Sequence, residues 1–142
     1  MSHEEALRNV PLFAGLEAAD LQRLAKILVP RRYEPGEVIL KEGSEAIGFF
    51  VVSSGKVRVV KDLGSDKERT LATLTPGEFF GETALLDGYP RSASVQAVEK
   101  TECLALTRWD FMGEVKGSPT MAVEIMRVLA RRLRQTDARL SE

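Results

Sequence analysis

Hydrophobic residues near the N-terminus recur with helical spacing. Positions i, i+3, i+4 and i+7 of one stretch are apolar: Leu21, Leu24, Ala25 and Leu28. This spacing places all of them on one face of a helix. Just before them, the apolar residues 10–13 followed by Gly15 predict a turn that is packed by its own side chains. We therefore expect residues 1–30 to form a helical segment.

The hydrophobic pattern changes after residue 30. Short runs rich in β-branched and aromatic residues alternate with glycines, and they include residues 49–53, 56–60, 70–74, 92–98 and 102–107. In one run Val57 and Val59 alternate with charged residues, which is typical of a half-buried strand. Gly64 falls at the predicted tip of a hairpin. Many short strands with glycine turns predict a sandwich, a barrel or a jelly roll for residues 31–108.

Helical signals return in residues 109–142. Thr107 followed by Asp110 resembles a capping box and predicts a short helix around residues 109–115, which Gly117 ends. Ser118 and Pro119 suit the N-cap and first position of the next helix, which we expect to continue to about residue 140.

Composition limits the possible classes of protein. The chain has 142 residues, which fits one domain over residues 1–142, and its net charge of −1 does not favour nucleic acid or an anionic membrane as a partner. It contains neither an apolar run of membrane-spanning length nor a secretory signal pattern at its start. A single cysteine, Cys103, excludes an internal disulfide and suggests a cytoplasmic protein. A single histidine, His3, argues against a metal centre and a histidine base, although a carboxylate acid–base pair stays open.

Residues 79–97 carry the most specific chemistry. Gly81 opens a run that is long enough for little more than one helical turn, and Gly88 is placed to end it. A helix start presents free N–H groups to an anion, and Arg91 could fold back on the same anion. Glu82 would then accept a hydrogen bond from a ribose hydroxyl at the edge of the site. Alternatively, Glu82 and Arg91 form a surface ion pair, and the glycines merely turn the chain.

This segment resembles the phosphate-binding cassette of the cyclic nucleotide-binding domain family. The resemblance rests on Phe80-Gly81-Glu82 and on Arg91-Ser92-Ala93, separated by small and apolar residues and a variable loop. It extends over nearly the whole chain, through residues 11–16 and the spacing of Gly36, Gly43, Gly55 and Gly77. It implies an α+β fold, in which an antiparallel β jelly roll (a double-stranded β-helix) is flanked by N-terminal helices and a long C-terminal helix.

The resemblance also implies a set of ligand-binding residues. The Arg91 guanidinium and the backbone N–H groups of residues 83–85 would hold a cyclic phosphate, next to Ser92 and Ala93. Glu82 and the Gly81 backbone would take the ribose 2′-hydroxyl. Val59 and Leu71, on two strands, would pack against the purine, although both could equally be plain core residues. The complete set is Gly81, Glu82, Thr83, Ala84, Leu85, Arg91, Ser92, Ala93, Val59, Leu71, Arg132 and Thr136.

The final helix offers two interpretations. An apolar seam runs through Ala122, Met126, Leu129, Leu133, Thr136 and Leu140. It either packs on its own domain or forms a homodimer. By resemblance to a dimeric member of the family, Thr136 would meet an adenine amino group, although Asp137 departs from that member's sequence. Arg132 would lie over the base or near the ribose, and the other arginines would form a solvated face.

The function implied is that of a non-catalytic cytoplasmic cyclic nucleotide sensor that signals through its last helix to an unknown effector. The expected ligand is cAMP, with cGMP as the alternative, because Ser92 is intermediate between the residues favoured by each. No metal, other cofactor, membrane or direct nucleic-acid contact is expected. One alternative is the regulatory half of a larger transcription factor or kinase-type regulator. The others are a nucleotide-independent interaction module on the same fold and a cupin-like metal enzyme, which the single histidine disfavours.

Overall fold

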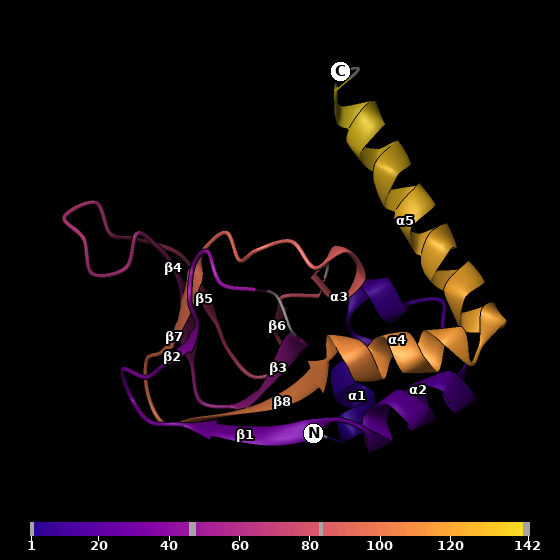
Figure 1. Cartoon of the computed structure of the whole chain (residues 1–142), viewed down its shortest axis with the longest axis horizontal. Helices are drawn as coiled ribbons and strands as arrows, with labels where there is room; N and C mark the ends of the chain where they lie inside the picture. Colours follow the sequence, from indigo (N-terminus) through magenta and orange to yellow (C-terminus); the bar gives the residue numbers. More distant parts are fainter. Residues whose placement is uncertain (1, 46–47, 83, 141–142) are drawn as a thin grey trace.

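Two four-stranded antiparallel sheets form the body of the protein (Figure 1), described by a computed structural model for residues 2–45, 48–82 and 84–140. In the first sheet the strand order is β1 (Val29–Tyr33), β8 (Thr101–Thr107), β3 (Gly48–Ser54) and β6 (Phe79–Phe80). In the second it is β2 (Val38–Leu40), β7 (Ser94–Ala97), β4 (Val57–Lys61) and β5 (Arg69–Leu74). With helices at both ends of the chain, this is the predicted antiparallel jelly roll.

The predicted strands correspond to observed ones, with shifts at their ends. The largest shift is in β7, which is shorter than the predicted run 92–98, so that Arg91 lies in the turn before the strand. The pattern did not predict β1, β2 or β6. In β1, Pro30 lacks an N–H donor, and its strand lies at the edge of its sheet, where proline is tolerated.

The two C-terminal helices begin where the capping residues predict. The N-terminal segment contains α1 (His3–Arg8), the 3₁₀ helix η1 (Pro11–Phe13) and α2 (Ala18–Lys26), whose predicted apolar stripe is buried. The Thr107 hydroxyl accepts a hydrogen bond from the Asp110 amide at 3.1 Å, at the start of α4 (Arg108–Lys116). The Ser118 hydroxyl accepts one from the Met121 amide at 3.3 Å, at the start of α5 (Pro119–Leu140).

Three phenylalanines join the helices to the first sheet. The ring of Phe13 lies 5.8 Å, centre to centre, from that of Phe49 on β3 and equally far from that of Phe111 on α4. All three side chains are buried, so this cluster holds η1 and α4 against the sheet. A second, smaller apolar cluster lies between the sheets and contains Val52, Val57, Phe80, Val95 and Cys103.

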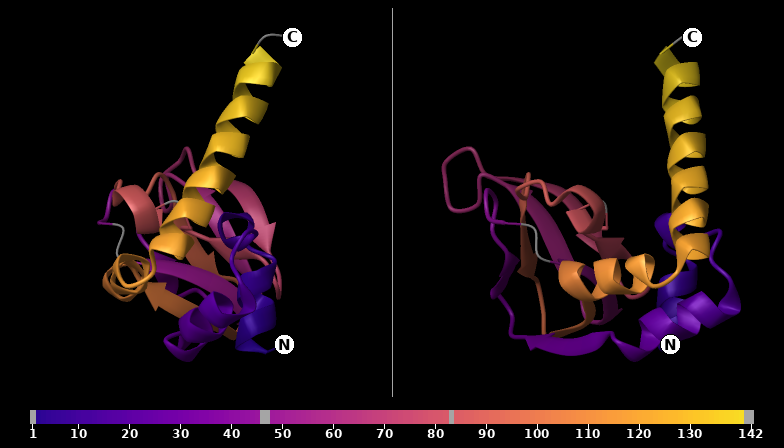
Figure 2. Two further views of the ribbon diagram at one scale, coloured as in Figure 1. Left: turned by 90° about the vertical axis from the view of Figure 1, so that its right-hand side faces the viewer. Right: turned by 45° about the vertical axis from the view of Figure 1, so that its right-hand side comes forward.

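The long helix α5 packs on its own domain through only one of its faces. Met121, Ile125 and Val128 are buried near its start, whereas the C-terminal part extends away from the sheets (Figure 2). Of the predicted apolar seam, Leu129 is partly buried against the same core, whereas Met126 and Leu133 are 59% and 63% exposed. The face that packs on the domain therefore shares Leu129 with the predicted seam but leaves Met126 and Leu133 uncovered.

No helix in the described part of the chain is both long and apolar enough to cross a membrane.

Candidate functional site

The cassette is shaped by two glycines that adopt the left-handed conformation. After β6 the chain turns at Gly81, with φ of 83°, and enters the single helical turn α3 (Ala84–Asp87). Gly88, with φ of 69°, ends this turn as predicted, and its amide donates to the Ala84 carbonyl at 3.1 Å. A Cβ on residue 81 would collide with the guanidinium of Arg91. Gly81 therefore meets a conformational and a steric requirement together.

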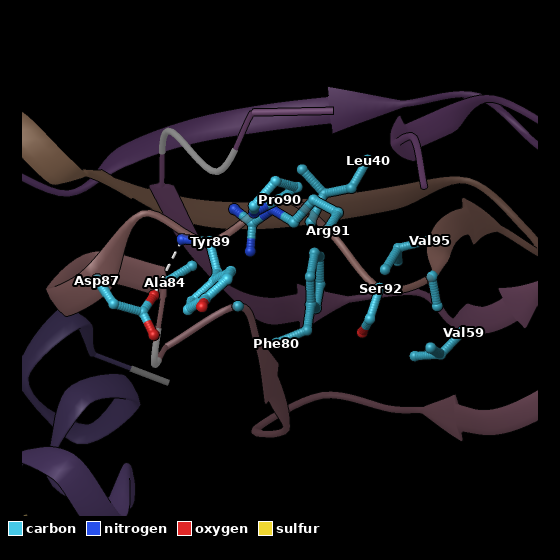
Figure 3. Close-up of a pocket in the computed structure, with 12 residues that line it drawn as sticks. Leu40, Val59, Phe80, Ala84, Asp87, Tyr89, Pro90, Arg91, Ser92 and Val95 are labelled. Atoms are coloured by element: carbon cyan, nitrogen blue, oxygen red, sulfur yellow. Dashed lines mark hydrogen bonds between the residues drawn. The ribbon is translucent and has the colours of Figure 1, made fainter. Parts of the chain in front are cut away.

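A cavity of about 450 Å³ opens between the cassette and the second sheet. It is lined by Leu40, Val59, Phe80, Gly81, Ala84, Asp87, Tyr89, Pro90, Arg91, Ser92, Ala93 and Val95. Figure 3 shows Asp87 and Ala84 toward one end of the cavity and Val59 and Val95 toward the other, with Arg91 and Phe80 between them. The cavity thus combines a cationic centre with an apolar end, which suits an anion attached to a flat apolar group.

Arg91 is the buried charge of this cavity. The residue is 8% exposed, and its Nη2 donates to the Gly48 carbonyl oxygen. Its Nε is buried without a hydrogen-bond partner, and within the described ranges no carboxylate lies at ion-pair distance from the guanidinium. Desolvation by burial lowers the pKa of Arg91, although an arginine stays protonated at neutral pH. A buried cation of this kind is costly unless an anion accompanies it.

Two backbone hydrogen bonds anchor Arg91 at its main chain. The Gly43 amide donates to the Arg91 carbonyl at 2.7 Å, and the Arg91 amide donates to the Ser44 carbonyl at 2.9 Å. The turn after β2 therefore holds the cassette from outside, a contact that the sequence pattern did not indicate.

Glu82 pairs with α5 and not with Arg91. Its two carboxylate oxygens each lie 3.4 Å from Nη2 of Arg132. The alternative of a surface ion pair between Glu82 and Arg91 is therefore wrong for this structure. The backbone carbonyl of Glu82 accepts a hydrogen bond from the Leu85 amide at 3.1 Å. That amide is already used in this conformation, so its contact with a phosphate stays a prediction.

The remaining predicted site residues divide into two groups. Val59, Ala84, Ser92 and Ala93 line the cavity, whereas Leu85 is fully buried in the core behind it. Four more predicted residues also lie outside the described lining: Leu71, Glu82, Arg132 and Thr136. Leu71 on β5 is 51% exposed, the Thr136 hydroxyl donates to the Arg132 carbonyl at 3.1 Å within α5, and Thr83 lies outside the described residues.

Six lining residues were not among the predicted ligand-binding residues: Leu40, Phe80, Asp87, Tyr89, Pro90 and Val95. Phe80 belongs to the cassette motif itself, and Val95 lies in the predicted strand run 92–98. Asp87, Tyr89 and Pro90 belong to the variable loop of the cassette, so their position between Gly81 and Arg91 was a usable signal. Asp87 accepts a hydrogen bond from the Tyr89 amide at 3.0 Å, which shapes this loop. Leu40 carried no such signal, because only the pairing of β2 with β7 brings it to the cavity.

The described residues contain no group of three or more His, Cys, Asp or Glu side chains arranged to hold a metal ion.

Comparison with known proteins agrees with this geometry. A family model described as "Cyclic nucleotide-binding domain" matches residues 30–117. The "Cyclic AMP receptor protein" of Thermus thermophilus is 41% identical over 134 residues, which cover 94% of this chain and 62% of that protein. The "cGMP-dependent protein kinase 2" of Homo sapiens is 36% identical over 107 residues, which cover 74% of this chain and 14% of that protein. This chain therefore spans less than two thirds of the length of either relative.

A solved structure shows the same architecture. The N-terminal domain of a transcriptional regulator from Streptomyces coelicolor A3(2) superposes with a TM-score of 0.86 and 32% sequence identity. The match covers 94% of this chain and 95% of that domain, so it includes the helices at both ends as well as the sheets.

Proposed function

Because the chain belongs to the cyclic nucleotide-binding domain family, we propose that it is a non-catalytic sensor that binds a cyclic nucleotide in the Arg91 cavity. The observation that carries this proposal is the state of Arg91. A guanidinium that is 8% exposed, with a buried unpartnered Nε, lines a cavity of about 450 Å³. The cyclic phosphate would supply the missing anion, with two exocyclic oxygens that match the planar fork of donors.

The neighbouring groups suit the rest of a cyclic nucleotide. Gly81 lines the cavity and lets the backbone approach closely. The carboxylate of Glu82, the next residue, would accept a hydrogen bond from the ribose 2′-hydroxyl at the edge of the cavity. The apolar end at Val59 and Val95 would receive the purine. Leu71 would join it if β5 moves toward the ligand, since its side chain is already exposed on that strand.

We propose cAMP as the ligand, with cGMP as the alternative. Ser92 lines the cavity and offers a hydroxyl directly after Arg91. The name of the Thermus relative refers to cyclic AMP, and that of the human relative refers to cGMP. The two names together therefore leave both nucleotides as candidate ligands. The bacterial relative has the higher identity and the longer match, which favours cAMP.

We propose further that α5 transmits the signal. Its Arg132 pairs with Glu82, the cassette residue next to the lining residue Gly81, so a ligand that engages Glu82 would change the position of the helix. The exposed seam residues Met126 and Leu133 would be buried against α5 of a second copy in a homodimer. An effector domain or protein would then read the position of α5. The lone buried thiol of Cys103 fits a reducing, cytoplasmic setting.

The test is calorimetric titration with cAMP and cGMP after the protein has been unfolded and refolded to strip any bound ligand. We expect micromolar or tighter binding by the parent chain. Arg91→Ala should weaken it by at least about a hundredfold, because a buried anion loses its cation at a cost of about 3–5 kcal/mol. Arg32→Ala is the matched control, since Arg32 lies on β1 with an exposed side chain. Absence of binding by the folded, stripped parent chain would leave a nucleotide-independent interaction module.

A further inference from the structure

Two charged residues outside the cassette hold the backbone that follows Arg91. Lys61, the last residue of β4, donates from Nζ to the Ser92 carbonyl at 2.8 Å. Glu42, in the turn after β2, places Oε2 at 3.3 Å from the same Nζ. Neither belongs to the described lining of the cavity, and the contact of Lys61 with the cassette is made through the Ser92 backbone.

Glu42 is itself fixed at three points. Its amide donates to the hydroxyl of Ser94, a residue that is 3% exposed, at 3.0 Å. Its Oε1 accepts the amide of Asp62 at 3.1 Å, and Asp62 has an unusual φ of 56° that this bond helps to hold. The bond from Asp62 and the ammonium of Lys61 lower the pKa of Glu42, so this carboxylate is charged at neutral pH.

The turn that contains Glu42 also forms hydrogen bonds with the backbone of Arg91. Gly43 and Ser44 make the two backbone hydrogen bonds to Arg91 described above. The main chain of Arg91 and Ser92 is therefore held by the Gly43 amide and the Ser44 carbonyl on one side and by Lys61 on the other. A long side chain such as arginine reaches a defined position only when its anchor is fixed. A charge-assisted bond to the Ser92 carbonyl provides such an anchor immediately after Arg91.

We propose that Lys61, held by Glu42, is a positioning residue for the phosphate-binding part of this cavity. It aligns the Arg91–Ser92 backbone so that the guanidinium and the Ser92 hydroxyl meet the phosphate together. The inference rests on the proposed function, because it concerns affinity for a cyclic nucleotide. The side chains of Lys61 and Glu42 are 36% and 30% exposed, so solvent screens the pair and the effect is moderate.

The first experiment compares cAMP binding by the parent chain, Lys61→Met, Lys61→Arg and Lys67→Met, with thermal unfolding of each ligand-free protein. Lys67 is the matched control, because it is exposed in the turn of the same β4–β5 hairpin. Lys61→Met should bind roughly five- to tenfold more weakly, Lys61→Arg should recover most of that loss, and Lys67→Met should match the parent chain. The ligand-free melting temperatures should agree within about 4 °C.

The second experiment tests whether the pair acts as a unit. Glu42→Gln alone should weaken binding, and the double variant Glu42→Gln with Lys61→Met should bind no more weakly than Lys61→Met. Additive losses would overturn the proposal, as would Lys61→Met binding like the control, or a loss that tracks the melting temperature and that arginine does not rescue. In those three cases the proposed function still stands. If the parent chain binds neither nucleotide, the proposed function fails and this inference falls with it.

Discussion

Nη2 of Arg132 lies 3.4 Å from each carboxylate oxygen of Glu82, so α5 is joined to the cassette by residues 50 positions apart in the chain. Glu82 is 16% exposed at its side chain and Arg132 is 32% exposed, which makes the pair partly sheltered. The single nitrogen shared by two oxygens leaves each oxygen able to accept a further hydrogen bond. Glu82 can therefore serve a ribose hydroxyl while it stays in contact with the helix.

Separate substitution of Glu82 and Arg132 should distinguish ribose binding from the contact with α5. Glu82→Ala should weaken cAMP binding by about tenfold or more, because the acceptor of the ribose hydroxyl is lost. It should also abolish the preference for cAMP over 2′-deoxy-cAMP. Arg132→Ala should cost up to about fivefold in affinity, as partly exposed ion pairs do, and should keep that preference. Competition calorimetry with cAMP and 2′-deoxy-cAMP measures this preference. An unchanged preference in Glu82→Ala would show that Glu82 does not bind the ribose.

Two glycines with nearly the same backbone conformation allow a second, controlled test. Gly81 and Gly64 have φ values of 83° and 86°, but only a Cβ on residue 81 would meet the guanidinium of Arg91. Both Gly→Ala variants should lose about 1 kcal/mol of unfolding free energy through backbone strain. Gly81→Ala should in addition bind cyclic nucleotide at least about tenfold more weakly, since Arg91 is displaced. Denaturant titration and calorimetry measure the two quantities, and equal affinities would refute the link between Gly81 and Arg91.

Cys103 should be unreactive in the folded protein. The residue is 0% exposed, and burial raises the pKa of its thiol to about 12. At pH 8 a disulfide reagent should therefore modify it only after denaturation. Prompt modification of the native chain would contradict this placement.

The same group predicts how stability depends on pH. The thiol has an ordinary pKa of 9.0, which its folded-state pKa exceeds, so the unfolded chain loses this proton first as the pH rises. Its contribution is fully present below pH 9 and is lost as the pH rises toward 12. Tyr33, whose pKa burial also raises, acts in the same direction. Urea denaturation at pH 8 and pH 10 should show a smaller fall in stability for Cys103→Ala than for the parent chain.

Local signals in the sequence were sufficient for most elements of the fold. The side chains of Thr107 and Ser118 form the predicted caps, and the two glycines that flank α3 take the left-handed conformation. These features depend on a few adjacent residues, which is why a pattern reveals them. The strands β1 and β2 escaped prediction because both are short edge strands, in which hydrophobic alternation is weak.

Most of the predicted residues that line the cavity lie within one segment, and Val59 on β4 is the exception. The cassette residues Gly81, Arg91 and Ser92 line the cavity as the motif indicates. Leu40 and the Glu42–Lys61 pair reach the same region through the pairing of β2 and β4 with β7, which no local pattern reports. The partner of Glu82 was also hidden, because the contact with Arg132 depends on how α5 leaves the domain.

The exposed face of α5 supports the last prediction, which concerns assembly. Met121, Ile125 and Val128 are buried against the domain, whereas the seam residue Leu133 is 63% exposed. If this seam forms the proposed homodimer, Leu133→Glu should convert the protein to a monomer, because two carboxylates would face each other in an apolar contact. Arg134→Glu changes an exposed residue on another face of the helix and should leave the dimer intact. Sedimentation velocity over a range of concentrations distinguishes these outcomes. A parent chain that remains monomeric at high concentration with cAMP bound would show that the seam has another partner or none.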